Sequence, residues 1–332
     1  MSLASSVAPT SSRVGVTSHP WVRFGVRRLG RLLVSLWVLV TASFLMIHLI
    51  PGDPVRAALG PTAPPALVAA KREEMGLDDP ILVQYWHYLQ NLFTGDLGTS
   101  IVSQLPVSEI VSQRLPATLE LALLAFAVAI AVAVPVGVLM GVLTRRGHGH
   151  RTELVFTGSS VVLGIIPDFL LGVGLVYVFG VNLGWLPVAG NDTPAAYVLP
   201  VLALAIGPAA ILSRIIRVEM VAVLQADFVR TARAKRLPSR TVYLGHALPN
   251  ALTASLTLGG LILSSMVAGT VLVENVFAWP GLGSTIVSSI LNKDYQVVQA
   301  IVLVYGVGVL LVNTSVDVAL ALLDPRSMIR ED

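Results

Sequence analysis

Six long apolar runs, in which charged residues are scarce, constrain this chain more than any other feature of its sequence. They cover residues 32–50, 117–143, 154–180, 197–219, 252–274 and 298–322. About 20 residues at ~1.5 Å rise per residue cross a hydrocarbon core of ~30 Å. Because an unpaired backbone group costs several kcal/mol in that medium, each run must be helical. The sequence therefore predicts an all-α, polytopic membrane protein with six transmembrane helices.

Composition agrees with a chain that faces lipid. Only 12% of the residues are charged, whereas soluble domains carry about 25%. The absence of cysteine excludes disulfide scaffolds and thiolate metal sites. The net charge of +3 alone would suit nucleic acid, but apolar runs separate the basic clusters, and we therefore exclude a nucleic-acid partner.

The distribution of lysine and arginine predicts the orientation. Seventeen of the 22 basic residues fall in the two tails, the second connection and the fourth connection. The remaining segments hold only Arg56, Lys71, Arg72, Arg114 and Lys293. Cytoplasmic loops are enriched in lysine and arginine, so both termini are expected in the cytoplasm.

The same patterns divide the chain. A Ser- and Thr-rich start predicts a disordered cytoplasmic tail over 1–25, and a first span follows at 26–50. That span is too long for a secretory signal and ends at a proline turn near Asp53. An extracytoplasmic region is expected at 51–116, and the other five spans form a core over 117–322. This core includes a cytoplasmic loop at 220–250, and a second tail is expected at 323–332.

The loop at 220–250 carries the most information. Asp227 is placed to cap a helix from residue 228 to 236, and Pro238 would end it. Apolar side chains share one face and arginines another: Phe228, Val229 and Ala232 against Arg230 and Arg233. So short a helix needs a surface. Docking in a groove of a soluble partner and lying on anionic lipid both remain open.

Asp168 stands out within the third run. It follows Pro167, which lacks an amide and would kink the helix, and an ionised carboxylate at that depth usually faces a cavity or a partner. One interpretation places Asp168 and Pro167 on a translocation path, where the carboxylate meets the ammonium of a passing peptide. The other has Asp168 hydrogen-bonded to Ser159, Ser160 or a neighbouring helix.

Seven stretches together carry a family resemblance. They are 49–54 (LIPGDP), 95–98 (GDLG), 114–120 (RLPATLE), 227–238 (DFVRTARAKRLP), 246–251 (HALPNA), 276–283 (VFAWPGLG) and 323–326 (LDPR). In this order they resemble the dipeptide, oligopeptide and nickel subfamily of ABC-importer permeases, specifically the first of the two permeases. The resemblance covers nearly the whole chain after residue 25. It implies the type I importer permease fold and the inner membrane of a prokaryote.

The resemblance also implies how the chain is driven. In that subfamily the cytoplasmic loop forms a coupling helix that sits in a cleft of the ATPase. Carried onto this sequence, the ATPase-coupling residues are Asp227, Phe228, Val229, Arg230, Thr231, Ala232, Arg233, Ala234, Lys235, Arg236, Leu248 and Pro249. The subfamily usually has glycine where this chain has Arg236, which puts the local turn in question because glycine adopts left-handed conformations at little cost.

The expected assembly contains a homologous second permease, one or two cytoplasmic ATPase subunits and an extracytoplasmic substrate-binding protein. No P-loop is present, because no Gly-Lys pair occurs in the chain. ATP and Mg are therefore expected on the ATPase, and this chain is expected to bind no cofactor or metal and to hold no catalytic residue. His148 and His150 lie beside arginines and are interpreted as a solvated basic turn.

Two other functions are compatible with a polytopic membrane protein. An ion-coupled secondary transporter or channel would carry several intramembrane ionisable groups, and often inverted repeats. A passive membrane anchor would not need proline inside its spans, as at Pro135, Pro200 and Pro208. The coupling-type loop favours the importer. The cargo remains open among dipeptides, oligopeptides, nickel chelates, glutathione and haem.

Overall fold

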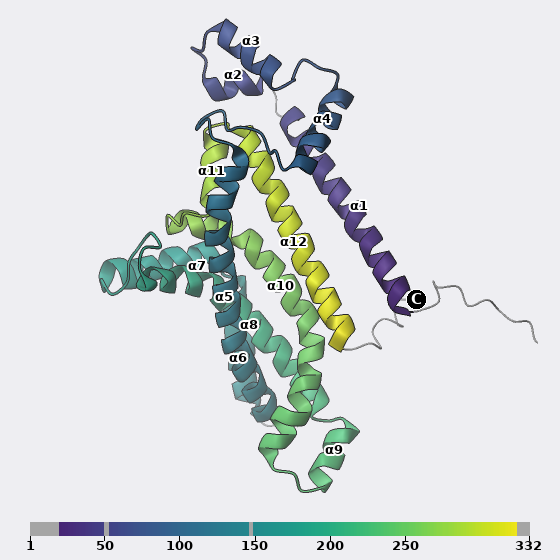
Figure 1. The fold of residues 1–332 in the computed structure, drawn as a ribbon. Coiled ribbons are helices and arrows are strands. Elements are labelled where there is room, and N and C mark those ends of the chain that lie inside the picture. Colours follow the sequence, from purple (N-terminus) through teal and green to yellow (C-terminus); the bar gives the residue numbers. More distant parts are fainter. Residues whose placement is uncertain (1–19, 50–52, 146–148, 324–332) are drawn as a thin grey trace, which may run out of the picture.

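The computed structural model describes residues 20–49, 53–145 and 149–323. Five helices in this part are long and apolar enough to cross a membrane. They are α1 (Pro20–His48), α5 (Val107–Leu143), α8 (Val198–Val223), α10 (Leu248–Val276) and α12 (Tyr295–Leu323). All run along the long axis of the molecule (Figure 1).

The sixth predicted span, 154–180, is broken. Helix α6 (His150–Ile165) is followed by α7 (Asp168–Leu175), which continues as the π-helical segment η3 (Val176–Asn182), and the two parts meet at 94°. Proline explains the break, because Pro167 removes an amide donor and pushes Ile166 to an extended conformation (ψ 123°). With this bent pair counted as one span, the structure confirms the predicted all-α fold with six spans.

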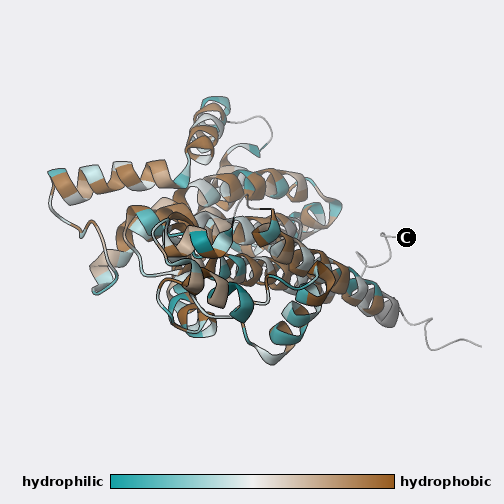
Figure 2. Ribbon diagram, turned by 90° about the horizontal axis from the view of Figure 1, so that it is seen from above, coloured by the Kyte–Doolittle hydropathy of each residue, from teal (hydrophilic) through white to brown (hydrophobic). Residues whose placement is uncertain are grey.

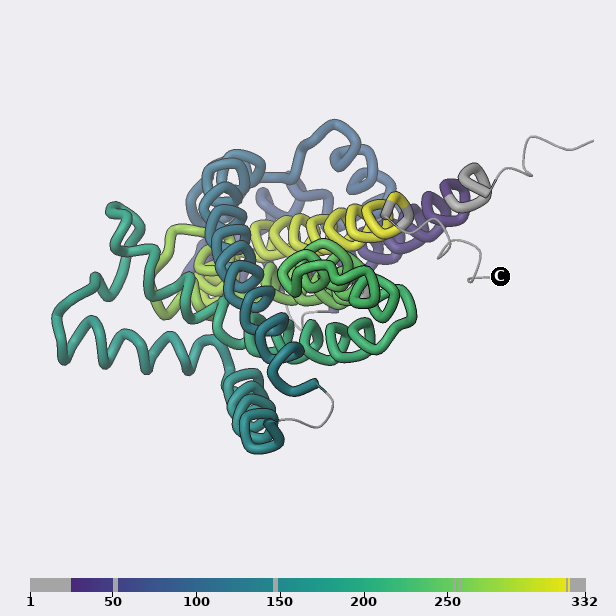
Figure 3. The backbone as a smooth tube through the Cα atoms, turned by 90° about the horizontal axis from the view of Figure 1, so that it is seen from below, coloured from purple at the N-terminus to yellow at the C-terminus, as the bar shows by residue number. Residues whose placement is uncertain are grey.

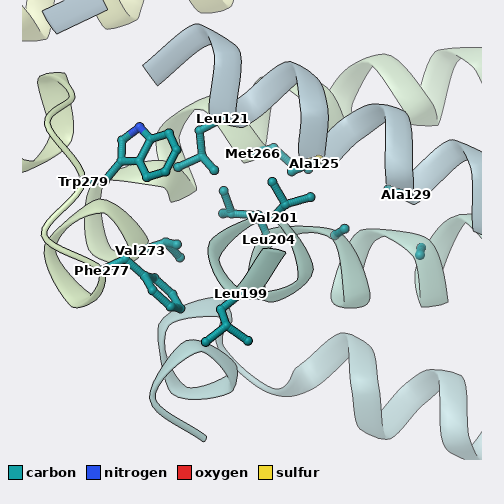
Figure 4. Close-up of a cluster of buried hydrophobic side chains, with 13 residues drawn as sticks. Leu121, Ala125, Ala129, Leu199, Val201, Leu204, Met266, Val273, Phe277 and Trp279 are labelled. Atoms are coloured by element: carbon teal, nitrogen blue, oxygen red, sulfur yellow. The ribbon is translucent and has the colours of Figure 1, made fainter. Parts of the chain in front are cut away.

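Helices α5, α8 and α10 form the core. A β-carbon on Gly137 of α5 would lie 2.7 Å from Ile216 Cβ of α8, and one on Gly141 would lie 2.6 Å from Met220 Cβ. Such small residues let helix backbones approach closely, which is how membrane helices gain packing energy. Leu121, Leu204 and Met266 bring the three helices together in one buried cluster (Figure 4).

Helices α12 and α1 are added to one side of this core. Seen from below, α12 lies between α10 and α1 (Figure 3). Side-chain hydrogen bonds join α1 to α12, where Ser43 Oγ donates to the Gln299 carbonyl at 3.1 Å and Gln299 Nε2 donates to the Ser43 carbonyl at 3.1 Å. Arg28 also forms an ion pair with Asp317.

Shorter helices cover the end of the bundle opposite α9 (Asp227–Ala234). They are α2 (Pro54–Leu59), α3 (Pro65–Glu74), α4 (Ile81–Thr94) and α11 (Leu282–Leu291). Ser100, in the loop after α4, donates to the buried Asp294 carboxylate between α11 and α12. This bond ties the region predicted as extracytoplasmic to the core.

Several boundaries differ from those expected. Helix α1 begins at Pro20, so residues 20–25 of the tail predicted as disordered are helical, and residues 1–19 lie outside the described part. Helix α5 begins at Val107, ten residues before the predicted span, and Pro116 and Pro135 lie inside it. The proline turn predicted before Asp53 and the tail after residue 323 also fall outside the described residues.

The α7–η3 segment leaves the bundle sideways as an arm. It projects to the left in Figure 1 and is apolar along most of its length in Figure 2. Large apolar side chains on it are exposed, among them Phe169, Leu170, Val173, Tyr177 and Val181. The isolated chain therefore leaves an apolar surface at this point that only lipid or another protein can cover.

Candidate functional site

Helix α9 lies at the lower tip of the molecule (Figure 1) and carries most of the predicted coupling residues. It spans Asp227–Ala234, so it begins one residue before the predicted helix (228–236) and ends two residues before it. Ala226 occupies the N-cap position, and no side chain caps the helix. The predicted cap by Asp227 is therefore wrong: its carboxylate lies in the first turn, where a negative charge favours the helix dipole, and it accepts a bond from Arg230 Nη1 at 3.3 Å.

The apolar face of α9 is covered by its own chain. Val229 and Ala232 are buried in a cluster with Met220, Val242 and Ala247, and Leu248 packs against the same cluster. Sequence reasoning had assigned Val229 and Ala232 to the face that meets a partner. The structure corrects this, because the end of α8 and the start of α10 supply the surface that so short a helix requires.

The opposite face of α9 is open. Asp227, Thr231 and Ala234 are exposed along its centre, with Phe228 and Arg230 at its edges. Phe228 is the large apolar member, and 45% of its surface is exposed. We call these five residues the outer face of α9. Exposed aromatic side chains are enriched in protein-binding surfaces.

Arg236 adopts the left-handed conformation, with φ of 56°. The Arg236 amide donates to the Arg233 carbonyl at 2.9 Å, and the Leu237 amide donates to the Ala232 carbonyl at 3.3 Å. The turn that glycine would favour is thus kept without glycine, at a cost of about 1–2 kcal/mol. Helix α9 ends before this turn, and Pro238 follows it rather than causing it.

Ionic and aromatic contacts hold this end of the bundle together. Arg145 Nη1 donates to the Tyr243 hydroxyl at 2.6 Å, next to α9. Arg217 of α8 pairs with Glu153 of α6 at 2.6 Å and donates to Thr144 Oγ1 at 3.0 Å. Arg145 and Arg217, two of the arginines on the predicted cytoplasmic side, therefore also connect α5, α6, α8 and the loop beside α9. Pro249 occupies the second position of α10.

Asp168 lies at the start of α7, not in the middle of a helix as predicted. A β-carbon on Gly207 of α8 would lie 3.4 Å from one carboxyl oxygen, and a β-carbon on Gly269 of α10 would lie 3.4 Å from the other. The carboxylate thus sits between α8 and α10, where two glycines leave room for it. Ser159 donates instead to the Phe156 carbonyl at 3.0 Å.

The backbone around Pro167 constrains the surroundings of Asp168. Non-helical backbone at membrane depth is tolerated only where protein buries it or a water-filled cavity borders it. Pro167 is exposed in the isolated chain, and Asp168 is half-buried. A second chain or an aqueous channel must therefore border this break.

Sequence reasoning missed Glu274, which is completely buried near the end of α10. Its carboxylate accepts bonds from the Thr118 hydroxyl at 2.8 Å and from the Gly283 and Ser284 amides at 2.7 and 3.1 Å. It therefore binds the free amides at the start of α11 and joins α5, α10 and α11. The signal was available, since a glutamate at the end of an apolar run precedes a Gly-x-Gly turn.

Trp279 belongs to the same region. It lies between an apolar run and a turn, where an interfacial aromatic is expected, but its side chain is fully buried. Trp279 Nε1 donates to the Ala117 carbonyl at 3.0 Å, and its ring meets Tyr197 edge-on. Trp279 is thus a packing residue between α5 and the α10–α11 turn.

Within the described residues, no three His, Asp or Glu side chains lie close enough together to hold a metal ion. His150 opens α6, and His148 lies outside the described part. The two features of the described residues that bear on function are the exposed outer face of α9 and the half-buried Asp168 carboxylate at a helix break.

The chain matches two family models that together cover most of its length. The model described as binding-protein-dependent transport system inner membrane component matches residues 133–329. The model of the N-terminal part of the membrane component of such systems matches residues 21–122.

Individual relatives agree. The glutathione transport system permease protein GsiC of Pectobacterium atrosepticum is 39% identical over 304 residues, covering 92% of this chain and 98% of the relative. GsiC of Escherichia coli strain K12 is 37% identical over 304 residues with the same coverage of both chains.

A solved structure supports the fold. An inward-facing conformation of the MetNI methionine ABC transporter matches with a TM-score of 0.56 at 17% identity, over 65% of this chain and 96% of the other. The family matches favour the importer over an ion-coupled transporter or a passive anchor. The chain belongs to the family of binding-protein-dependent transport system inner membrane components, and it is a permease subunit of an ABC importer.

Proposed function

We propose that this chain is one of two homologous permeases that enclose the channel of an importer for short peptides. ATPase subunits sit on the α9 end, and an extracytoplasmic binding protein delivers cargo to the opposite end. The cargo assignment is supported by the relatives, which are named as glutathione transport permeases, because glutathione is itself a short peptide. Dipeptides and other short peptides belong to the same chemical class.

The orientation follows from the charges. Seventeen of 22 lysine and arginine residues are in the tails and in the connections on the α9 side of the chain, so the α9 end and both termini face the cytoplasm. Helices α2, α3 and α4 then lie on the external side.

The outer face of α9 is the observation that carries the proposal. The inner side of α9 is buried against its own chain, whereas Phe228 remains exposed at one edge of the outer face. An apolar residue on an exposed helix at a cytoplasmic tip fits helix-in-groove docking. The ATPase supplies the groove and binds ATP and Mg. This chain contributes no catalytic residue, and its part in the cycle is differential packing in two conformations.

The second permease covers the α7–η3 arm. That arm exposes a continuous apolar surface, and the backbone break at Pro167 requires a neighbouring chain or a channel. A homologous partner on this side would place Asp168 near the shared channel. The Asp168 carboxylate then meets the ammonium group of a passing peptide.

Affinity purification from native membranes tests the docking surface. The wild-type chain is expected to bring down an ATPase chain and a second permease in fixed ratio. Phe228→Asp places a charge in the groove and should lose the ATPase while keeping the second permease. Phe228→Leu should keep both.

A buried variant serves as the comparison. Val229→Asp puts a charge into the cluster beneath α9 and should reduce the amount of folded chain. Recovery of the wild-type chain alone, with peptide uptake that needs no ATP, would overturn the proposal and favour ion coupling through Asp168. Full ATPase recovery with Phe228→Asp would move the docking surface away from α9.

A further inference from the structure

Helix α4 differs from its neighbours at the same end of the molecule. It contains fourteen residues, Ile81–Thr94, and none is Asp, Glu, Lys or Arg. Helix α3 nearby carries Lys71, Arg72, Glu73 and Glu74. A solvated helix of a soluble region normally resembles α3, because charged residues cover its exposed side.

One face of α4 packs on the upper part of α1. The Tyr85 hydroxyl lies 2.8 Å from Thr41 Oγ1, and Gln84 Oε1 lies 3.0 Å from His48 Nε2. The rings of Tyr85 and Phe44 meet edge-on at 5.1 Å. Thr41 and Phe44 belong to a membrane-spanning helix, so this contact fixes α4 at the depth where α1 leaves the bilayer.

The opposite face of α4 is apolar and exposed. Leu82, Trp86 and Phe93 recur at helical spacing on it, and their exposed fractions are 79%, 60% and 90%. We call these three residues the α4 stripe. Phe93 is the most exposed of the large hydrophobic residues in the described part of the chain.

We propose that α4 is an interfacial helix whose stripe is inserted into the lipid at the boundary between headgroups and acyl chains. An amphipathic helix lies in that boundary with its apolar face buried by about 5–10 Å, and tryptophan is enriched there. On α1 itself the large apolar side chains of Val34, Trp37 and Val38 are exposed as well. Because α1 is lipid-facing and α4 is fixed to it, lipid covers both.

The assignment changes the role of the region between the first two spans. Helices α2 and α3 remain in water, whereas α4 anchors them to the membrane surface and holds the upper end of α1. The proposal for α4 does not depend on which cargo the importer carries or on how the ATPase docks. Either proposal can therefore be overturned while the other stands.

The absence of cysteine from the chain makes a labelling test direct. Single cysteines at Leu82, Trp86 and Phe93 each receive a nitroxide spin label in the full importer, reconstituted in nanodiscs of phosphatidylethanolamine and phosphatidylglycerol. A cysteine at Glu74, on the neighbouring α3 with 63% of its side chain exposed, is the control. Collisions with oxygen, which concentrates in lipid, and with a water-soluble nickel chelate are then measured.

Labels on the stripe are expected to collide severalfold less often with the nickel chelate than the label at Glu74, and more often with oxygen. A bimane fluorophore at Phe93 should also be quenched by doxyl-labelled phospholipid. Stripe labels as open to the nickel chelate as the label at Glu74 would overturn the proposal and place the stripe in water. Protection from both reagents would overturn it in favour of a protein interface, with the second permease or the binding protein.

Discussion

Two carboxylates inside the spans have opposite surroundings. Glu274 is completely buried and accepts three hydrogen bonds that join three helices. Asp168 is half-buried between Gly207 and Gly269, beside an exposed break in the backbone. A carboxylate with every oxygen bonded stabilises structure, whereas one beside an opening can meet a passing cation.

Asp168→Asn keeps the size of the side chain and removes its charge. If Asp168 meets the ammonium of the cargo, uptake of a free dipeptide should fall about tenfold, corresponding to ~1.4 kcal/mol. The measurement is uptake of labelled dipeptide by the reconstituted importer, with its ATPase rate recorded alongside.

An N-acetylated dipeptide is the control for Asp168, because it has no ammonium group. Its uptake is expected to be equal in wild type and Asp168→Asn. Unchanged uptake of the free dipeptide by both Asp168→Asn and Asp168→Ala would remove this residue from the translocation path.

Glu274→Ala should destabilise the chain strongly. It leaves the Thr118 hydroxyl and the Gly283 and Ser284 amides without their acceptor, and each unsatisfied buried group costs about 1–3 kcal/mol. Thermal unfolding in detergent should therefore begin at a clearly lower temperature than in wild type. The exposed Glu109→Ala is the matched control, with an expected change within ~0.5 kcal/mol; equal effects of the two variants would contradict the buried role.

At the scale of single elements, helix α9 has an apolar side that is buried against its own chain and a following turn that is strained at Arg236. Arg236→Gly should stabilise the turn by about 1 kcal/mol, because glycine tolerates a φ of 56° without a β-carbon clash. Lys235→Gly is the control, since Lys235 has φ of −74° and gains nothing from glycine. Hydrogen exchange over 227–240 should slow in the first variant and quicken in the second; slowing in both would refute the strain.

The α2–α3 pair predicts a response to acid. Burial acts to raise the pKa of the Asp53 carboxyl, but hydrogen bonds from the Arg56 and Val55 amides and from the Arg72 guanidinium outweigh it and hold the pKa below its usual value. The stabilisation is therefore present above about pH 4, the ordinary pKa of aspartate, and is lost as pH falls through the lowered pKa.

A spin label at Ala69 in α3 reports this contact. Its mobility should rise only below about pH 4 in otherwise wild-type protein. In Asp53→Asn, which cannot ionise, mobility should be high throughout and independent of pH. In wild-type protein the mobility of this label should not change near neutral pH. A change there, or no change in acid, would show that the Asp53–Arg72 contact does not hold α2 and α3 together.

For the molecule as a whole, the sequence predicted the fold class well because few backbone structures can cross a membrane. Apolar runs of about 20 residues must be helices, so the spans and the all-α fold followed directly. The short helix after Asp227 was predicted from its apolar and basic faces and from Pro238, whereas its assignment as a coupling loop came from the family resemblance of residues 227–238 and 246–251.

What remained hidden depends on tertiary contacts. The 94° break follows from Pro167, but its angle is set by how α7 packs against α8 and α10. The inward burial of Val229 and Ala232 required knowing that the ends of α8 and α10 lie beneath α9. The contacts of Glu274 and Trp279 could not be predicted because their partners on α5 are more than 150 positions away in the chain.

ATP-driven uptake tests the central claim most directly. The assembly purified with this chain from its native membrane is reconstituted into liposomes, and uptake of labelled glutathione and of a dipeptide is followed with the binding protein present. The account predicts uptake that requires ATP hydrolysis, is lost in Phe228→Asp and is kept in Phe228→Leu. Uptake that continues without ATP, or that is unaffected by Phe228→Asp, would contradict it.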